Sequence, residues 1–270
     1  PIPALAGTSE MPDPEFYQGN IENFIGLTVV PTGLAGPLRM RGDYAKGDFY
    51  LPMATTEGAL VASYNRGARI TRAAGGITSL IGGQSVQRAP LFAFERVTDA
   101  VAFATWIEGQ EGAFRTVTSR SSGHAQLSEV SIHLEANLVY LIFAYRTGDA
   151  AGQNMVTFCT QAICKYVLEH TPVQPLYWFL ESNLSGDKKA TFVSFLRGRG
   201  WTATAEVVLP EQLVRERLRT TPKQMATFWQ TGTVAAIQAG SIGVAGHIAN
   251  GLTALFLACG QDVACISEAS

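Results

Sequence analysis

The 270-residue sequence has few charged residues, few cysteines and no long apolar run. Charged side chains make up 16% of it and the net charge is −2, so no strong field would attract nucleic acid. The four cysteines form no Cys-x-x-Cys pair, which argues against a metal site or a disulfide framework and predicts buried free thiols in a reducing compartment. Apolar stretches such as 252–259 are too short to cross a bilayer. We therefore expect no nucleic-acid partner, no membrane span and no metal.

The composition is that of a globular protein. Apolar residues make up 47% of the chain, which is long enough for one large domain or two of ordinary size. The start, Pro1-Ile2-Pro3, does not resemble a signal peptide. The expected location is the cytoplasm.

The N-terminal part predicts loops, short strands and one helix. Glycine and proline are frequent in residues 1–50. A helix is expected from Thr55 or Thr56 to about Arg72, because hydroxyl side chains often cap helices. Two glycine pairs should break the pattern that follows, Gly75-Gly76 and Gly82-Gly83.

Residues 90–179 read as a compact unit of a strand, a helix, two strands, a helix and a strand. Alternation of apolar and polar residues predicts the hairpin, and amphipathic spacing predicts the helices. We interpret 90–179 as a small domain inserted in a large mixed helix/sheet domain made of 1–89 and 180–270, an α+β fold. The expected elements are a strand at 91–95, helices at 99–108 and 152–170, a hairpin over 130–145 that turns near 135–137, and a strand at 176–180.

The last third predicts a second hairpin and three helices. The hairpin would join 191–196 to 202–208 around Arg197-Gly198-Arg199-Gly200. The aromatic residues near 178, 179, 228 and 229 are expected in the core. The helices are expected at about 211–219, 222–237 and 247–259.

Three short runs place charged groups beside glycine or small residues. Glu57 follows small and apolar residues, which suggests a buried acid that can donate a proton; the alternative is a surface carboxylate at a helix start. Lys188, in Ser185–Lys189, is either a cation that faces a developing oxyanion or part of an ordinary turn. Asp262 lies just past a predicted helix end, where the dipole disfavours a carboxylate, and this weakly indicates function.

The run 148–155 ends a strand and opens the long helix. Close glycine backbone at a helix N-terminus can bind phosphate, and a plain capped helix start is the alternative. The run is not Gly-x-Gly-x-x-Gly and no Walker motif occurs, so a Rossmann site is not expected.

Taken together, these runs resemble the 3-hydroxy-3-methylglutaryl-coenzyme A reductase family in its soluble bacterial form. The resemblance extends over nearly the whole chain, with its motifs in family order. They are Asn23-Phe24-Ile25-Gly26, Pro31–Leu38, 52–63, 148–155, 185–189, Ala239–Gly243 and 259–262.

The resemblance implies an oxidoreductase that reduces the thioester to mevalonate and coenzyme A with two NAD(P)H, a step of isoprenoid biosynthesis. It implies that Glu57 protonates the carbonyl oxygen, that Lys188 stabilises the oxyanion, and that Asp262 is hydrogen-bonded to them. A further histidine, which protonates the departing thiolate, lies in the family on a segment that would follow position 270. The inserted domain would be ferredoxin-like and would bind NADPH, with NADH as the alternative.

The resemblance also implies binding residues and a homodimer or higher homo-oligomer with its site at the subunit interface. The acyl-coenzyme A substrate is expected to contact Arg69, Arg88, Asp187, Lys189, Arg219 and Asn250. The cofactor is expected to contact Asp149, Ala150, Gly152, Asn154 and Met155.

Three positions depart from the family pattern. Gly123 stands where many members have an arginine that helps to hold the dinucleotide. Thr231 stands where animal members have a lysine that meets the substrate carboxylate, and Glu181 replaces a serine. Thr231 and Glu181 leave open an enzyme of the same fold that acts on a different acyl thioester. The family's C-terminal histidine, which is not among the 270 residues, leaves open a non-catalytic homologue that binds coenzyme A or a dinucleotide.

Overall fold

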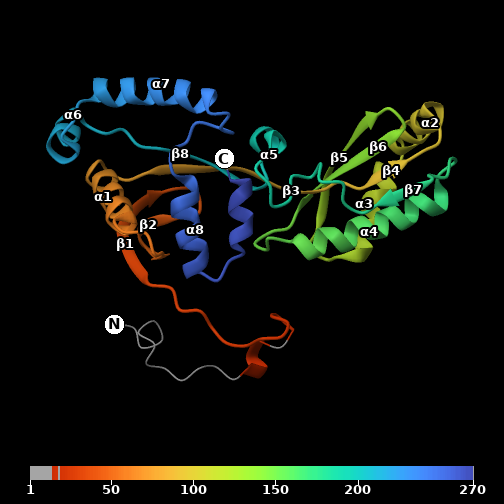
Figure 1. Ribbon diagram of the computed structural model, residues 1–270, viewed down its shortest axis with the longest axis horizontal. Coiled ribbons are helices and arrows are strands. Elements are labelled where there is room, and N and C mark those ends of the chain that lie inside the picture. Colours follow the sequence, from red (N-terminus) through yellow and green to blue (C-terminus); the bar gives the residue numbers. More distant parts are fainter. Residues whose placement is uncertain (1–13, 18, 270) are drawn as a thin grey trace. The chain divides into compact units, whose positions relative to one another are not determined.

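The computed structural model describes residues 14–17 and 19–269, and the predicted absence of a signal peptide at Pro1-Ile2-Pro3 lies outside this range. Contacts divide the chain into two compact units (Figure 1). The first unit contains the described residues up to Ile77 together with Val207–Arg219 and Ala249–Val263. The second unit contains Thr78–Glu206, Thr220–Ile248 and the segment from Ala264.

The first unit is built on an antiparallel ribbon. Strands β1 (Thr32–Arg41) and β2 (Lys46–Ala54) pair along their length, and helix α1 (Leu60–Ala73) follows. A small core joins the ribbon, α1 and α8 (Ile248–Ala258) through Ala35, Met53, Leu60 and Ala254. The unit also contains the short helices η1 (Pro14–Tyr17), α6 (Glu211–Leu213) and η2, a π-helical turn at Val214–Leu218.

The predicted start of the first long helix is wrong by several residues. Helix α1 begins at Leu60, because Ala59 has a left-handed backbone with φ 67°. Before it, the Thr55 hydroxyl accepts the Glu57 N–H at 3.0 Å. The hydroxyl therefore stabilises a turn rather than the first turn of the helix.

The second unit contains an antiparallel sheet with strand order β7-β4-β6-β3-β8, and β5 pairs with β6. Within it, the order β7-β4-β6-β5 with antiparallel neighbours is that of a β-α-β-β-α-β unit. The Gly82-Gly83 pair lies inside β3, at a register shift, and does not break the strand as predicted. The strands are β3 (Thr78–Arg88), β4 (Leu91–Ala93), β5 (Gln126–Glu135), β6 (Leu138–Arg146), β7 (Tyr177–Phe179) and β8 (Gly200–Glu206).

Helices α2 (Val97–Glu108), α3 (Glu111–Ser121) and α4 (Gln153–His170) pack against the sheet (Figure 1). Helix α2 contacts β5 and β6, α3 contacts β5, and α4 contacts β3 and α3. Alternate residues of β6 from Val139 to Tyr145 belong to one buried cluster with all three helices. The predicted hairpin, the helices α2 and α4 and the strands β4 and β7 are confirmed, whereas α3 was not predicted. Every member of the cluster lies between Val86 and Leu180. This range is close to the proposed insertion at 90–179, which stays a prediction.

The predicted hairpin around Arg197-Gly198-Arg199-Gly200 is wrong. Residues Phe192–Arg197 form helix α5, whose cap is Thr191: its hydroxyl accepts the Ser194 N–H at 3.1 Å. Strand β8 pairs instead with β3. A local turn pattern could not reveal this partner, because β3 lies about a hundred residues earlier in the chain.

Helix α7 (Pro222–Gln238) contradicts the expectation of buried aromatics. It has no buried residue, and Phe228 and Trp229 are 78% and 62% exposed. The three predicted helices of the last third are otherwise present, with the first divided between α6 and η2. The chain ends in a 3-10 helix, η3 (Val263–Glu268).

None of the four cysteines forms a disulfide, but their expected burial is only half right. Cys159 and Cys164 are buried in the core, and burial raises the pKa of each thiol. Cys259 is exposed and Cys265 is half-buried. The two thiols of α4 therefore act as packing groups.

Candidate functional site

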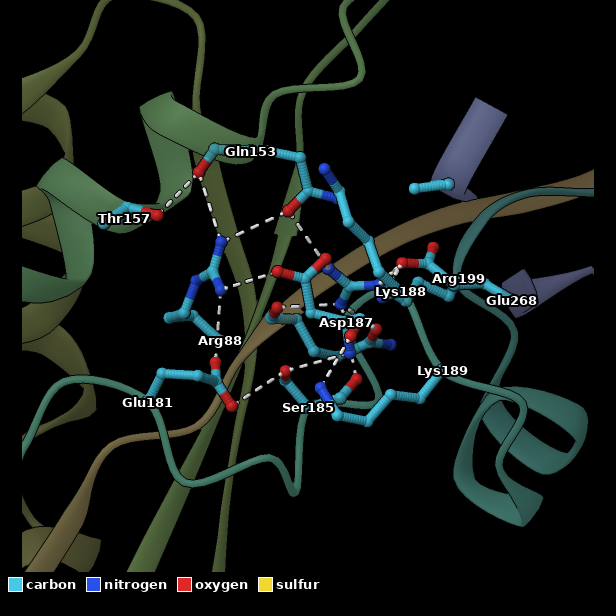
Figure 2. Close-up of polar contacts among 12 residues, drawn as sticks. Arg88, Gln153, Thr157, Glu181, Ser185, Asp187, Lys188, Lys189, Arg199 and Glu268 are labelled. Carbon is cyan, nitrogen blue, oxygen red and sulfur yellow. Dashed lines mark hydrogen bonds and ion pairs between the residues drawn. The ribbon is translucent and has the colours of Figure 1, made fainter. Parts of the chain in front are cut away.

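The Ser185–Lys189 loop connects β7 to α5 in the second unit, and its shape depends on glycine. Gly186 has φ 73°, and a Cβ there would lie 2.9 Å from the hydroxyls of Thr191 and Ser194. Lys188 also has a left-handed backbone, with φ 53°, which is uncommon for a residue with a side chain. The Lys188 N–H donates to Oε1 of Glu268. The loop is therefore ordered by specific contacts, shown in Figure 2.

Asp187 lies between two buried arginines. Its Oδ2 accepts from Arg88 Nη1 at 3.0 Å, and its Oδ1 accepts from Arg199 Nη2 at 2.9 Å (Figure 2). Burial alone would raise the pKa of Asp187, but the charge of Arg199 and the hydrogen bond and charge of Arg88 outweigh it and hold the pKa below its usual value. The carboxylate is therefore a fixed anion at neutral pH.

Arg88 is the centre of the predicted substrate group. Its Nη1 also lies 3.2 Å from Glu181 Oε2, and its Nη2 donates to Gln153 Oε1 at 3.2 Å. Lys189 Nζ donates to the main-chain oxygen of Asp187 at 3.0 Å. The structure thus brings together Arg88, Asp187, Lys188 and Lys189, which the sequence had placed in one site.

Two residues of this site were missed at the sequence level. Arg199 was interpreted as part of a turn, yet its side chain is only 1% exposed and pairs with Asp187 and Glu268. Glu268, whose side chain is 7% exposed, comes from η3. For Arg199, the only available sign of a site was a charged residue next to glycine in the Arg197–Gly200 run. The same run is typical of a turn, so it did not indicate a buried arginine.

The predicted cofactor segment surrounds the start of α4. Gly152 has φ 74°, and a Cβ there would lie 2.4 Å from Thr147 Cγ2. The Gln84 side chain holds the preceding loop, since its Oε1 accepts the N–H groups of Thr147 and Gly148 at 2.9 and 3.1 Å. Of the predicted contacts, Gly152 and Met155 are half-buried, and the rest are exposed: Asp149, Ala150 and Asn154.

The remaining predicted catalytic residues lie in the first unit. Glu57 is exposed, so its expected burial is wrong. The reason is the turn before α1, which carries Glu57 away from the small core of this unit. Asp262 is exposed just after α8, as its position in the sequence predicts. Asn250 is half-buried in the first turn of the same helix.

A basic cavity of about 830 Å³ lies in the first unit, beside α1 and the π-helical turn. Asn65 Oδ1 accepts the Gly36 N–H at 3.2 Å and fixes one wall. Arg72 also lines the cavity and pairs with Asp48 at 2.9 Å. The predicted Arg69 lines the cavity, and Arg219 follows η2 with a left-handed backbone but is not among the lining residues. The cavity's other arginines, missed by sequence reasoning, are Arg66 and Arg217.

No helix in the described part of the chain is long and apolar enough to cross a membrane. Within 14–17 and 19–269, His, Cys, Asp and Glu side chains form no group that could hold a metal ion.

Comparisons with known proteins relate the chain to one family. The profile described as Hydroxymethylglutaryl-coenzyme A reductase matches residues 4–270. The 3-hydroxy-3-methylglutaryl-coenzyme A reductase of Pyrococcus abyssi is 43% identical over 262 residues, 95% of this chain and 63% of the relative. That of Aeropyrum pernix is 40% identical over 257 residues, 95% of this chain and 61% of the relative. The chain therefore spans less than two thirds of the length of these relatives.

A solved structure has the same fold. It is the class II 3-hydroxy-3-methylglutaryl-CoA reductase from Streptococcus pneumoniae bound to NADPH in open conformations. The TM-score is 0.70 at 17% identity, over 96% of this chain and 67% of the other. The mixed helix/sheet fold expected from the sequence is thus confirmed.

Proposed function

The chain belongs to the hydroxymethylglutaryl-coenzyme A reductase family, and from this premise we propose that it takes part in reducing 3-hydroxy-3-methylglutaryl-coenzyme A to mevalonate and coenzyme A. The observation that carries the proposal is the ordered group of Arg88, Asp187, Lys188 and Lys189 on one loop and one neighbouring strand. It places several cations and one fixed anion where a polar acyl group can be held.

In the proposed reaction, NADPH would supply two hydrides in succession. The thioester would become a hemithioacetal, which gives the aldehyde when its C–S bond breaks and coenzyme A leaves as a thiolate that takes up a proton, and the aldehyde would then become the alcohol. Negative charge develops on the carbonyl oxygen as each hydride is added, and the Lys188 ammonium stabilises it. Glu57 supplies the proton for that oxygen, and its exposure leaves it accessible to a bound substrate. Asp262 completes the proposed network.

The start of α4 suits the dinucleotide. The N-cap residue, Gly152, has no side chain, so it makes no side-chain hydrogen bond to the N–H groups of the first turn. N–H groups at a helix start attract phosphate, so this segment would hold the pyrophosphate of NADPH, and Asp149, Asn154 and Met155 would lie around it. We propose NADPH as the cofactor and keep NADH as the alternative.

The basic cavity of the first unit suits the phosphates of coenzyme A. Arg66, Arg69 and Arg217 all line it, and guanidinium groups bind phosphate through paired hydrogen bonds. We add Arg66 and Arg217 to the proposed substrate contacts Arg69 and Arg219.

A homodimer in the cytoplasm is also part of the proposal. Helix α7 exposes Phe228, Trp229, Val234 and Ile237, and exposed apolar side chains that gather on one element can mark an interaction surface. A second copy that covers α7 would remove it from solvent. Free thiols suit a reducing compartment such as the cytoplasm.

One observation favours the alternative of a different acyl thioester. Glu181 and Asp187 both contact Nη1 of Arg88, so Arg88 has less charge to offer to a substrate carboxylate. In addition, the Thr231 hydroxyl donates to the main chain of its own helix. A neutral acyl group would suit such a site better than a carboxylate does.

The decisive experiment follows the absorbance of NADPH with the purified protein and 3-hydroxy-3-methylglutaryl-coenzyme A. We expect two NADPH to be consumed for each mevalonate formed. No oxidation of NADPH or NADH would contradict the proposal, and turnover only of an acyl thioester without the terminal carboxylate would support the alternative. Turnover that survives both Glu57→Gln and Lys188→Ala would refute the assignment of these two residues.

A further inference from the structure

Arg199 is a buried cation with several partners from distant parts of the chain. Its side chain is 1% exposed, and its guanidinium reaches four segments of the second unit (Figure 2). Arginine is suited to this role because its planar fork offers several donors in fixed directions. The contacts are Gln87 O at 2.9 Å, Ser185 O at 3.3 Å, Gln153 Oε1 at 3.1 Å, Asp187 Oδ1 at 2.9 Å and Glu268 Oε1 at 2.9 Å.

One of these contacts leads directly to the main chain of Lys188. Glu268 Oε1 is the oxygen that Arg199 Nε approaches, and it also accepts the Lys188 N–H. The contact between Arg199 and Glu268 is an ion pair rather than an aligned hydrogen bond, because Nε has no acceptor in line with it. The Glu268 carboxylate is therefore held by the charge of Arg199 while it accepts a hydrogen bond from the Lys188 loop.

The Lys188 backbone needs such support. Its φ of 53° lies in the left-handed region, which a lysine adopts only where the surroundings impose it. Gly186 allows the turn, but the contact that fixes Lys188 itself comes from Glu268 in η3. A change in the backbone at this residue would redirect its side chain.

We propose that Arg199 is a positioning residue, which acts through Glu268 and Asp187 to fix the Lys188 backbone and thereby the direction of its ammonium group. The catalytic part of this inference rests on the proposed function; the structural part does not.

The structural part is tested by hydrogen exchange, measured by mass spectrometry on peptides that cover 184–190. We expect faster exchange in Arg199→Met and in Glu268→Ala, and the double variant should exchange no faster than Arg199→Met alone. Arg197→Met is the control, because Arg197 lies two positions away with a half-exposed side chain, contacting Ser131 at 3.0 Å. Exchange equal to the wild type in both single variants would overturn the inference.

The catalytic part is tested by steady-state kinetics on the same variants. We expect kcat of Arg199→Met to fall by about 100-fold, with KM for the thioester changed far less, since a misplaced catalytic group costs roughly this much. Arg199→Lys keeps the charge but not the planar guanidinium, so its kcat should lie between those of the wild type and Arg199→Met. This variant replaces Arg199→Met in the test if the methionine variant does not fold. A loss confined to KM would overturn the inference.

The experiments distinguish a failure of the proposed function from a failure of the inference about Arg199. A wild-type protein that oxidises no cofactor refutes the proposed function, and the exchange data still decide whether Arg199 orders Lys188. An active wild type with unchanged kcat and exchange in Arg199→Met refutes the inference alone.

Discussion

Arg88 donates to Asp187 across 3.0 Å, although the two residues are 99 positions apart. The contact joins the end of β3 to the loop that carries Lys188, and both partners are largely shielded from water. Breaking such a pair by removing one partner leaves a buried charge without compensation. The Arg88–Asp187 pair therefore gives the stability of the second unit a measurable pH dependence.

We expect Asp187→Asn to flatten the acid limb of the stability profile. The folded pKa of Asp187 is lowered, so its contribution is present above the unfolded value of about 4 and is lost as the pH falls further. Urea midpoints measured between pH 7 and pH 3 test this, with the exposed Asp43→Asn as control. Identical acid limbs for wild type and Asp187→Asn would contradict it.

Gly152→Ala should destabilise the protein and weaken dinucleotide binding. The added Cβ would meet Thr147 at 2.4 Å in a left-handed backbone, a cost of about 1–3 kcal/mol. Gly148→Ala is the matched control, since Gly148 is also left-handed, with φ 67°, but has open space around it. Thermal unfolding and titration with NADPH give the two readouts. Equal effects of the two substitutions would show that the contact with Thr147 is unimportant.

Two glycine substitutions in helices should act in opposite directions. Gly251→Ala in α8 would place its Cβ 2.1 Å from Tyr64 Oη, and such overpacking costs about 1–3 kcal/mol. Gly67→Ala in α1 meets no atom within 4 Å and should stabilise the protein by ~0.5–1 kcal/mol, since alanine is the better helix former. Chemical denaturation measures both, and a loss of stability for Gly67→Ala would be inconsistent with this view.

Arg217→Ala should weaken binding of coenzyme A by about 10- to 100-fold, the usual effect of losing a hydrogen bond to a charged group. The dissociation constant from calorimetry is the measurement. Arg215→Ala is the control, because Arg215 pairs with Glu211 and does not line the cavity. Binding of coenzyme A that is unaffected by Arg217→Ala would remove this cavity from the proposed site.

Trp229→Glu should raise the dissociation constant of the proposed homodimer by roughly 30-fold or more, as expected for a central aromatic anchor. Analytical ultracentrifugation over a range of concentrations measures it. Phe158→Glu alters an aromatic that is 65% exposed on α4 and should leave assembly unchanged. A protein that is monomeric throughout, or a Trp229→Glu dimer as tight as the wild type, would exclude α7 as the interface.

Local patterns were sufficient to predict most elements of residues 90–179. The hairpin β5–β6 and the helix α4 follow from alternation and amphipathic spacing, which need no distant partner to be recognised. Sequence patterns predicted the wrong secondary structure where tertiary contacts or a single backbone conformation determine it. Residues Phe192–Arg197 are apolar enough for a strand but form a helix, and the start of α1 depends on one left-handed residue, Ala59.

The candidate site also contains some residues that the sequence identified and others that only the structure revealed. The sequence identified Asp187, Lys188 and Lys189, because the motif that contains them keeps its order in a known family, and the resemblance to that family also identified Arg88. No motif of that family identified Arg199 or Glu268. Their roles depend on burial and on contacts that span up to 112 positions, and neither property can be inferred from the neighbouring residues.

The sequence by itself determined the family, the mixed helix/sheet composition and the identity of the charged groups, since side-chain chemistry and short-range periodicity are local properties. Only the tertiary structure decided that Glu57 is exposed, that β8 pairs with β3, and that one buried arginine holds the Lys188 loop. The physical reason is that burial changes the energy of a charge far more than its neighbours in sequence do. Burial is set by the packing of segments that are distant in the chain.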